Sequence, residues 1–219
     1  MPRGEFDRSA RRAQTRTRLL EAAAQVYARR GFEGATLEEV ASEAGFTKGA
    51  VYGHFGSKEN LLLALVEEYL AGAVSEQVTL FDRDRATWER PLAGSERAME
   101  GLRENPEPFR LFIELWVYAQ RDERLRQRLA SGLAALRATF ARFAADSSAD
   151  AGLDPPTAVT EQFANVMLGL GLGLSLLELS EPEAIPSKLL GTTLSVLIRA
   201  TESSAQAQEA FRKLGEEAR

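Results

Sequence analysis

The sequence predicts an all-α protein with a small N-terminal unit and a larger C-terminal helical domain. Apolar residues recur at the three- and four-residue spacing of helices along most of the chain, and no run alternates between apolar and polar residues over the length of a strand. Glycines, prolines and capping residues divide this pattern into separate helices. We expect a flexible basic tail over residues 1–10, a first domain over residues 11–56 and a second domain over residues 57–219.

The first two helices are defined by their apolar faces and by their ends. One helix is expected over residues 11–30, where apolar side chains share one face and most arginines lie on the others. Its apolar positions are Leu19, Ala23, Val26 and Tyr27. Gly31 is expected to end this helix. Thr36 and Glu39 then form a T-x-x-E capping box at the start of a second helix, which Gly45 closes.

Two further helix starts follow within the first 70 residues. Thr47 can cap a short third helix that reaches about His54, and Ser57 can cap a fourth that continues through the run LLLALVEEYL. The pattern is then interrupted by Pro91, Pro106 and Pro108. Beyond these prolines we expect four longer helices, over residues 108–122, 123–146, 155–180 and 185–214.

Composition and length indicate an ordinary globular protein. The chain has 219 residues, of which 44% are hydrophobic and 27% are charged, so it can bury a sizeable core. It contains no cysteine, which excludes disulfides and thiolate zinc sites. Residues 1–15 lack the apolar core of a signal peptide, and the longest apolar run, Val166 to Leu177, is shorter than the ~18 residues of a membrane span. We therefore expect a soluble, cytoplasmic protein.

Charge is unevenly distributed along the chain. The formal net charge is −5, which for the chain as a whole argues against a nucleic-acid-binding protein. Residues 1–30, however, hold eight arginines against three acidic residues, whereas residues 57–219 hold 25 acidic and 18 basic residues. A basic end can attract phosphate while the acidic remainder keeps the protein soluble. A basic tail that contacts nothing is the alternative.

The spacing of three residues in the second and third helices indicates a helix-turn-helix. Ala41, Gly45 and Val51 stand four and six residues apart. Two helices that meet at a steep angle need a small residue at their contact, a residue that tolerates positive φ at the turn, and an apolar residue that docks the second helix. In such a motif the second helix enters the DNA major groove. A buried helix pair that binds no DNA is the alternative.

The residues around this motif resemble a known family. The run from Arg18 to Leu61 contains GFEGATLEEVASEAGFTKGAVYGHFGSKENL, which resembles the DNA-binding region of the TetR (tetracycline repressor) family of bacterial transcription regulators. The C-terminal portion, which includes LFIELWVYAQRDERLRQRL, resembles the effector-binding domains of that family more loosely. The resemblance implies a helix-turn-helix domain over residues 11–56, and a ligand-binding and dimerisation domain over residues 57–219.

The resemblance also assigns DNA-binding roles to individual residues. Thr36 would place a helix N-terminus against a DNA phosphate, where backbone N–H groups and the helix dipole favour an anion; a purely structural cap is the alternative. Thr47 and Lys48 would open the recognition helix and face bases and backbone, with a solvated lysine as the alternative for Lys48. Further phosphate contacts are expected from Tyr52, His54 and Lys58.

The other residues of the recognition helix have different expected roles. Gly49 would let the exposed helix face approach DNA without obstruction by a side chain. Val51 and Phe55 are expected in the core, where they hold the helix down. Gly53 departs from the bulkier residue that is frequent at this position in the family, so we assign it no contact.

His54 is the only histidine and therefore also a candidate general base. No catalytic motif places a serine, an aspartate or a second histidine beside it, and without cysteine or further histidines a metal cluster lacks ligands. We therefore predict no enzymatic activity, no cofactor and no metal. An enzyme acting in an aromatic pocket, and an architectural protein that binds DNA without sequence preference, are the alternative classes.

An aromatic group in the C-terminal part marks the expected site of a small-molecule effector. Apolar pockets between bundled helices commonly bind small molecules, although the same residues could simply form the core. The residues are Phe109, Phe112, Trp116, Tyr118, Phe140 and Phe143. Glu114 and Glu178 are acids in apolar stretches that could meet a cationic ligand, but Arg110 stands four residues before Glu114 and offers an ordinary ion pair.

The last two helices are expected to form a homodimer interface, as in the family. Small residues four apart allow close helix approach, and leucines supply a complementary stripe; the residues are Gly169, Gly173, Leu190, Leu194 and Leu197. Packing within the chain alone is the alternative. A two-fold dimer can read a pseudo-palindromic operator in double-stranded DNA. Effector binding would shift the fourth helix, which belongs to both parts, and so change the separation of the two recognition helices.

Overall fold

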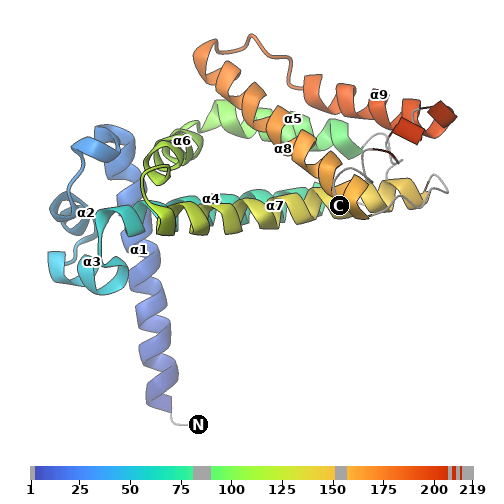
Figure 1. Cartoon of the computed structure of the whole chain (residues 1–219). Coiled ribbons are helices and arrows are strands. Elements are labelled where there is room, and N and C mark those ends of the chain that lie inside the picture. The colour runs from blue at the N-terminus through green and yellow to red at the C-terminus, as the bar shows by residue number, and fades with distance from the viewer. Residues whose placement is uncertain (1–2, 81–89, 151–156, 207–208, 211–212, 214–219) are drawn as a thin grey trace. The chain divides into compact units, whose positions relative to one another are not determined.

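The structure, a computed structural model, describes residues 3–80, 90–150, 157–206, 209–210 and 213. Every assigned element within these residues is a helix, which confirms the predicted all-α class. The helices are α1 (Arg3–Gly34), α2 (Leu37–Ala44), α3 (Lys48–Phe55), α4 (Lys58–Leu80), α5 (Arg90–Glu104), α6 (Glu107–Ala119), α7 (Glu123–Asp150), α8 (Thr157–Ser180) and α9 (Leu189–Ser203) (Figure 1).

The chain divides into two compact units. Unit 1 consists of Met1–Tyr69 and Glu107–Ala130, and unit 2 consists of Leu70–Pro106 and Ser131–Arg219. Helices α4 and α7 therefore contribute residues to both units. The functional boundary predicted between residues 56 and 57 stays a prediction.

Helix α1 is longer than the sequence pattern indicated. It begins at Arg3, so residues 3–10 are helical where a flexible tail was expected. The segment contains Arg3, Arg8 and Ala10, which are good helix formers, and no proline interrupts it. Near the other end, Gly31 has φ 67° and ψ 168°, which breaks the helix at the predicted residue before a last turn to Gly34.

Helix α5 was missed because Pro91 was interpreted as a break in the pattern. Pro91 is the second residue of this helix, which runs from Arg90 to Glu104. In the first turn of a helix the backbone N–H groups have no partner within the helix, so a proline is tolerated there. The proline that was expected to interrupt the pattern therefore lies at a helix start.

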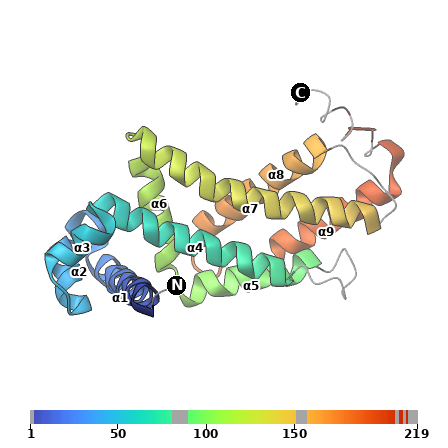
Figure 2. The ribbon, with the colours of Figure 1, turned by 90° about the horizontal axis from the view of Figure 1, so that it is seen from below.

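Unit 2 is organised around direct contact between α5 and α9, which lie side by side (Figures 1 and 2). Gly191 makes this approach possible, because a Cβ added to it would lie 2.5 Å from the carbonyl oxygen of Pro91. Next to this contact, a buried apolar cluster joins α7, α8 and α9. Its members are Phe143, Met167 and Leu194, with Phe140, Phe163 and Leu190 packed against them.

Helix α8 is unusually apolar for its exposure. Among the described residues, the stretch Val159–Ser180 is long and apolar enough to cross a membrane by length and composition alone, with a mean hydropathy of 1.5. The apolar run noted in the sequence, Val166 to Leu177, is shorter than this stretch because polar residues precede and follow it. Only 17% of an 18-residue segment of this stretch is buried inside the chain, and its exposed apolar residues are Val166, Leu170, Leu176 and Leu177.

Candidate nucleic-acid interface

The predicted capping box at the start of α2 is confirmed. The backbone N–H of Glu39 donates to the Thr36 hydroxyl at 3.2 Å, and the backbone N–H of Thr36 donates to the Glu39 carboxylate at 2.9 Å. Two N–H groups that the helix itself cannot satisfy are thus paired reciprocally. Thr36 remains exposed, so its cap does not remove it from contact with an external group.

The turn between α2 and α3 is built on Gly45, as predicted. Gly45 adopts φ 72°, in the left-handed region that favours glycine. Its N–H donates to the Ser42 carbonyl at 3.2 Å, and the N–H of Phe46 donates to the Ala41 carbonyl at 2.8 Å, the two bonds of a Schellman motif. The Arg18 guanidinium on α1 secures the turn by donating to the Ala44 carbonyl at 3.1 Å.

Helix α3 has one buried and one exposed side. Val51 and Phe55 are buried, so they hold the helix against the rest of unit 1. The exposed residues are Thr47, Lys48, Gly49, Tyr52 and Gly53. Thr47 also caps the helix, because its hydroxyl accepts the backbone N–H of Ala50 at 3.3 Å. The residues predicted to face DNA at the start of α3 therefore all lie on its solvent side.

Neither glycine of α3 is required by contacts inside the chain. A Cβ added to Gly49 would meet only the Thr47 hydroxyl, at 3.8 Å, and one added to Gly53 would have no atom within 4 Å. Both residues are helical, so no unusual φ explains them either. Because glycine weakens a helix by ~1 kcal/mol relative to alanine, a reason for Gly49 is best sought in an external partner.

Lys48 is not an isolated cation. Its ammonium forms an ion pair with Glu38 of α2 and lies 5.5 Å from the centroid of the Tyr52 ring. The hydrogen bond to Glu38 raises the pKa of Lys48 and the same bond lowers the pKa of Glu38. A phosphate that binds Lys48 would have to replace this carboxylate. Glu38 therefore weakens non-specific anion binding at the start of the recognition helix.

His54 is half-buried at the end of α3 and close to two arginines of α1. Burial and the charges of Arg12 and Arg16 lower its pKa below the usual 6.5. The imidazole is therefore neutral at pH 7 in the unbound protein, and it can donate one hydrogen bond. Contact with a phosphate would add a negative charge nearby and favour its protonation.

Lys58 is used within unit 1 in this structure. Its ammonium donates to the Glu33 carbonyl at 3.0 Å and lies 4.6 Å from the centroid of the Phe32 ring. A cation at this place satisfies a carbonyl at the C-terminal end of α1. The predicted contact of Lys58 with phosphate stays a prediction, and it requires this hydrogen bond to be shared or broken.

Glu114 has a role that sequence reasoning missed. It was considered as a partner for Arg110 or for a cationic ligand, but Arg110 pairs with Glu107 at 2.6 Å. The Glu114 carboxylate instead accepts the backbone N–H of Phe32 at 2.9 Å, just after the break at Gly31. It therefore ties α6 to the end of α1. Because the two residues are 82 positions apart, no local pattern could have revealed the pair.

Comparison with known proteins agrees with this geometry. Residues 19–65 match the sequence profile of bacterial regulatory proteins of the tetR family. Residues 19–65 therefore belong to the DNA-binding region of the TetR family. Over 127 residues it is 35% identical to the transcriptional repressor AcnR of Corynebacterium glutamicum, a match that covers 52% of this chain and 64% of AcnR. The matched segments span less than two thirds of the length of the curated relatives.

Solved structures share the fold of this chain along most of its length. A protein from Pseudomonas aeruginosa PAO1 superimposes with a TM-score of 0.73 at 18% identity, covering 92% of this chain and 94% of its own. The regulator FadR of Bacillus subtilis, solved with stearoyl-CoA, superimposes with a TM-score of 0.62 at 14% identity, covering 83% of this chain and 96% of its own. At these identities the likeness concerns the fold alone.

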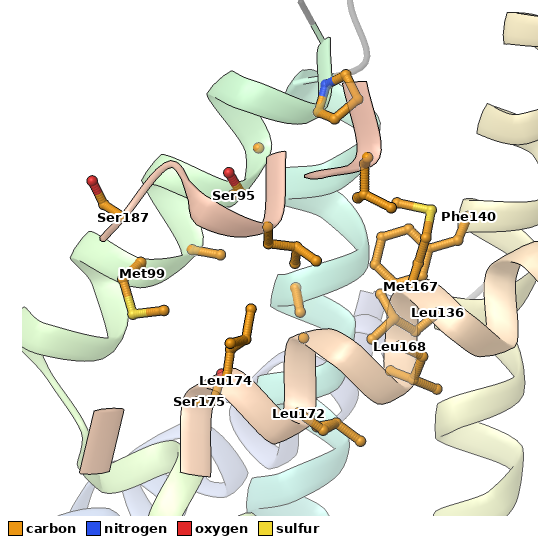
Figure 3. Close-up of a pocket in the computed structure, with 17 residues that line it drawn as sticks. Ser95, Met99, Leu136, Phe140, Met167, Leu168, Leu172, Leu174, Ser175 and Ser187 are labelled. Atoms are coloured by element: carbon orange, nitrogen blue, oxygen red, sulfur yellow. The ribbon is translucent and has the colours of Figure 1, made fainter. Parts of the chain in front are cut away.

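A second candidate site is an apolar cavity of about 160 Å³ in unit 2, lined by residues of α4, α5, α7, α8 and α9. Figure 3 shows Leu136, Phe140 and Met167 close together on one side and Ser95 and Ser187 on the other. None of the described residues that line it is charged. Ser95 is already engaged, since its hydroxyl accepts the backbone N–H of Gly191 at 3.0 Å.

The aromatic residues predicted to share one ligand site are divided between the two units. Phe140 lines the cavity, and Phe143 lies in the adjacent core cluster. The other four lie on α6 in unit 1 and are not part of the cavity lining: Phe109, Phe112, Trp116 and Tyr118. Phe109 and Phe112 are buried and stack on each other with centroids 5.7 Å apart, so they form core, the alternative considered from the sequence.

Glu178 is a structural carboxylate and not a free acid. It is 3% exposed, and its carboxylate accepts hydrogen bonds from Arg103 Nε at 2.7 Å and from the backbone N–H of Glu183 at 2.8 Å. These hydrogen bonds, led by that from Arg103, lower its pKa to about 2. The pair joins α5, the end of α8 and the following loop. A cationic ligand would have to displace Arg103 to reach it.

The predicted interface residues of α8 and α9 differ in their exposure. Gly169 and Gly173 have open space where a side chain would begin, and Leu197 is 40% exposed. Leu194, in contrast, is 2% exposed and belongs to the core cluster of unit 2, so it is not available to a partner in this conformation. Leu190 is half-buried against the same cluster. More exposed apolar residues, missed by the prediction, are Val166, Leu170, Leu176, Leu177 and Val196.

Proposed function

We propose that this TetR-family protein is a cytoplasmic transcriptional repressor that binds a pseudo-palindromic DNA operator as a homodimer and is released by a small, largely apolar molecule. The single observation that carries the proposal is the two-sided helix α3. Its buried Val51 and Phe55 fix its position, and its exposed face offers a hydroxyl, an ammonium, a phenol and a glycine at which a backbone can be approached.

The exposed face of α3 offers residues for two kinds of DNA contact: phosphate contacts, which position the helix, and contacts to base edges. Thr47 and Lys48 begin the helix, where the residues of a recognition helix reach base edges in the major groove. Tyr52, which is 46% exposed, and His54 lie about one turn later and would contact phosphate. Thr36 supplies the N-terminus of α2 for a further phosphate. Lys48 would exchange its ion pair with Glu38 for the DNA.

A homodimer is supported by the apolar surface of α8 and α9. Val166, Leu170 and Leu177 follow helical spacing and are each at least 41% exposed, with Gly169 and Gly173 on the same stripe. Exposed apolar surface of this kind marks an interface, and glycines on the stripe allow close helix approach. Two copies joined by a two-fold axis would present two α3 helices to two operator half-sites.

Release by a small molecule is supported by the uncharged cavity of unit 2. A cavity of about 160 Å³ accommodates a group about the size of benzene, because an engineered apolar cavity of ~150 Å³ in another protein binds that molecule. A larger effector therefore requires the surrounding helices to move. AcnR is named a repressor, which supports a repressor role. The FadR structure holds stearoyl-CoA, whose long acyl chain supports a largely apolar effector.

Coupling between the two sites would involve α4, which begins next to α3 and contributes residues to both units. An effector can change DNA affinity only if it binds the DNA-competent and the released conformations with different affinities. We propose that occupation of the cavity displaces the part of α4 that includes Ala73, one of the cavity-lining residues, and thereby alters the positions of the recognition helices.

The test is selection of DNA fragments by the purified full-length protein, followed by sequencing of the bound fraction. The expected result is a shared sequence with two-fold symmetry. Tyr52→Ala should weaken binding to that sequence, while Arg126→Ala, which removes an exposed arginine paired with Glu123 of its own helix, should not. Bound fragments without a common sequence would instead indicate an architectural DNA-binding protein and would contradict the proposal.

A further inference from the structure

Helix α1 carries two exposed arginines one turn apart on the side that adjoins α3. Arg12 and Arg16 stand four residues apart, so they share one face of the helix. Both are exposed. Figure 1 shows α1 running past α3 within unit 1, with its first turns continuing beyond the helix-turn-helix. From the sequence we expected only a general concentration of basic charge in this part of the chain.

Contacts at the end of α3 locate this face next to the recognition helix. The Arg16 guanidinium carbon lies 5.6 Å from the centroid of the Phe55 ring, and that ring is 6.0 Å from the His54 ring. The positive charges of Arg12 and Arg16 also act on His54, whose pKa they lower. Two guanidinium groups and an imidazole are therefore gathered at the C-terminal end of α3.

Three other arginines of α1 contact α2 or the turn that follows it. Arg18 donates to the Ala44 carbonyl and covers the Phe46 ring at 4.9 Å. Farther along, Arg29 pairs with Glu43 and Arg30 pairs with Glu39; these two acidic partners are outside the group at the end of α3. Within the described residues no acidic side chain pairs with Arg12 or Arg16. Their charges are thus uncompensated beside a helix proposed to enter DNA.

We infer that Arg12 and Arg16 of α1, together with His54, form a second phosphate-binding surface that holds the DNA backbone beside the groove occupied by α3. Guanidinium groups match phosphate oxygens in charge and geometry. Because the surface continues from Tyr52 and His54 onto α1, one DNA strand could contact both helices. The inference rests on the proposed function and adds residues outside the helix-turn-helix to its DNA contacts.

The test measures the salt dependence of binding to the DNA selected by the wild-type protein. Each phosphate contact contributes about 0.9 to the slope of log affinity against log salt concentration. The Arg12→Ala/Arg16→Ala variant should therefore bind more weakly and lose about 1.8 from this slope per protomer, if each arginine binds one phosphate. Arg12→Lys/Arg16→Lys should keep most of the slope, and Arg126→Ala is the control that removes an exposed arginine from another helix.

Two further measurements keep the outcome clear. Arg12→Ala alone removes no contact seen within unit 1, so it should leave the melting temperature unchanged while reducing the slope by about 0.9 per protomer. Ethylation of DNA phosphates should interfere with wild-type binding at positions that no longer matter for the double variant. An unchanged slope and an unchanged ethylation pattern would overturn this inference alone, whereas failure of the wild-type protein to select any shared sequence would overturn the proposed function.

Discussion

The exposed face of α3 and the exposed apolar residues of α8 and α9 present opposite chemistry. On α3 the outward residues are polar or small, whereas on α8 and α9 they include valines and leucines that are 40% to 60% exposed. A polar face suits a charged, hydrated partner whose contacts exchange with water and ions. Burial of an apolar face lowers the free energy of the protein in water. The difference fits the proposal that one surface binds reversibly to DNA while the other joins two copies of the chain.

The helix-turn-helix and unit 2 also differ in the polar contacts that hold them. In the helix-turn-helix, the capping bonds connect residues only a few positions apart, as in the pair Thr36 and Glu39. In unit 2, the Arg103–Glu178 pair connects residues 75 positions apart. Loss of a local cap should weaken one helix end, while loss of the long-range pair should weaken the packing of three elements.

The largest expected effect comes from placing a charge on the apolar surface of α9. Val196 is 60% exposed in the monomer, and Val196→Glu would bury an unpaired carboxylate if this surface forms a dimer. We expect dimerisation to weaken by more than ~3 kcal/mol, which sedimentation velocity would detect as a monomer. Val117→Glu on α6, where the valine is 62% exposed, is the matched control. Equal dimer content in both variants would contradict this interface.

The next effect concerns the stability of unit 2. Glu178→Ala leaves the Arg103 guanidinium without its carboxylate and should lower the free energy of unfolding by about 3 kcal/mol, measured by urea denaturation at pH 7. Because the folded pKa is lowered from 4.5 to about 2, the stabilisation is present above pH 4.5 and is lost as pH falls towards 2. A variant of exposed Glu104 should show neither change. Similar acid sensitivity in Glu178→Ala and wild type would contradict this role.

A smaller effect separates the two roles considered for Thr36. Thr36→Ala removes the cap of α2 and should cost about 1 kcal/mol of stability, whereas Thr36→Ser keeps a hydroxyl and should cost less. If the N-terminus of α2 also holds a phosphate, Thr36→Ala should reduce DNA affinity measured well below its melting temperature. Normal DNA affinity in a folded Thr36→Ala protein would assign the residue to the cap alone.

The smallest effect is the pH dependence contributed by His54. Its pKa is lowered in the folded protein, so the unfolded chain binds a proton more readily, and stability should decline as pH falls below 6.5 towards the folded pKa. DNA phosphate would favour the protonated ring, so affinity should rise as pH is lowered through the same window. Because this is the only histidine, fluorescence anisotropy of His54→Gln at pH 6 and pH 8 tests the assignment. The same pH dependence in that variant would refute it.

Most of the helix-turn-helix could be predicted because its determinants are local. Thr36, Gly45 and Thr47 act through hydrogen bonds to residues within a few positions, and these have recognisable sequence patterns. The inward direction of Val51 and Phe55 follows from helical spacing together with the packing of a known motif. The DNA contacts of the exposed residues stay predictions, because contact with DNA depends on a partner outside the chain.

Unit 2 was predicted less well because its arrangement depends on contacts between distant segments. Aromatic residues close in sequence were expected to share a pocket, but Phe112 lies in the core of unit 1 while Phe140 lines the cavity of unit 2. Leu194 has the spacing of an interface residue, yet it faces the cluster with Phe143 and Met167. Helical periodicity identifies an apolar face but does not say whether the same chain or another covers it.

The sequence by itself determined the helical class, the caps of the helix-turn-helix and the resemblance to TetR regulators, since periodicity, capping and motif spacing act over short distances. Only the tertiary structure decided that Glu114 binds the backbone at Phe32, that Arg103 neutralises Glu178, and that Arg12 and Arg16 lie beside His54. These relationships depend on how the chain brings remote segments together, which single-residue propensities and local spacing do not encode.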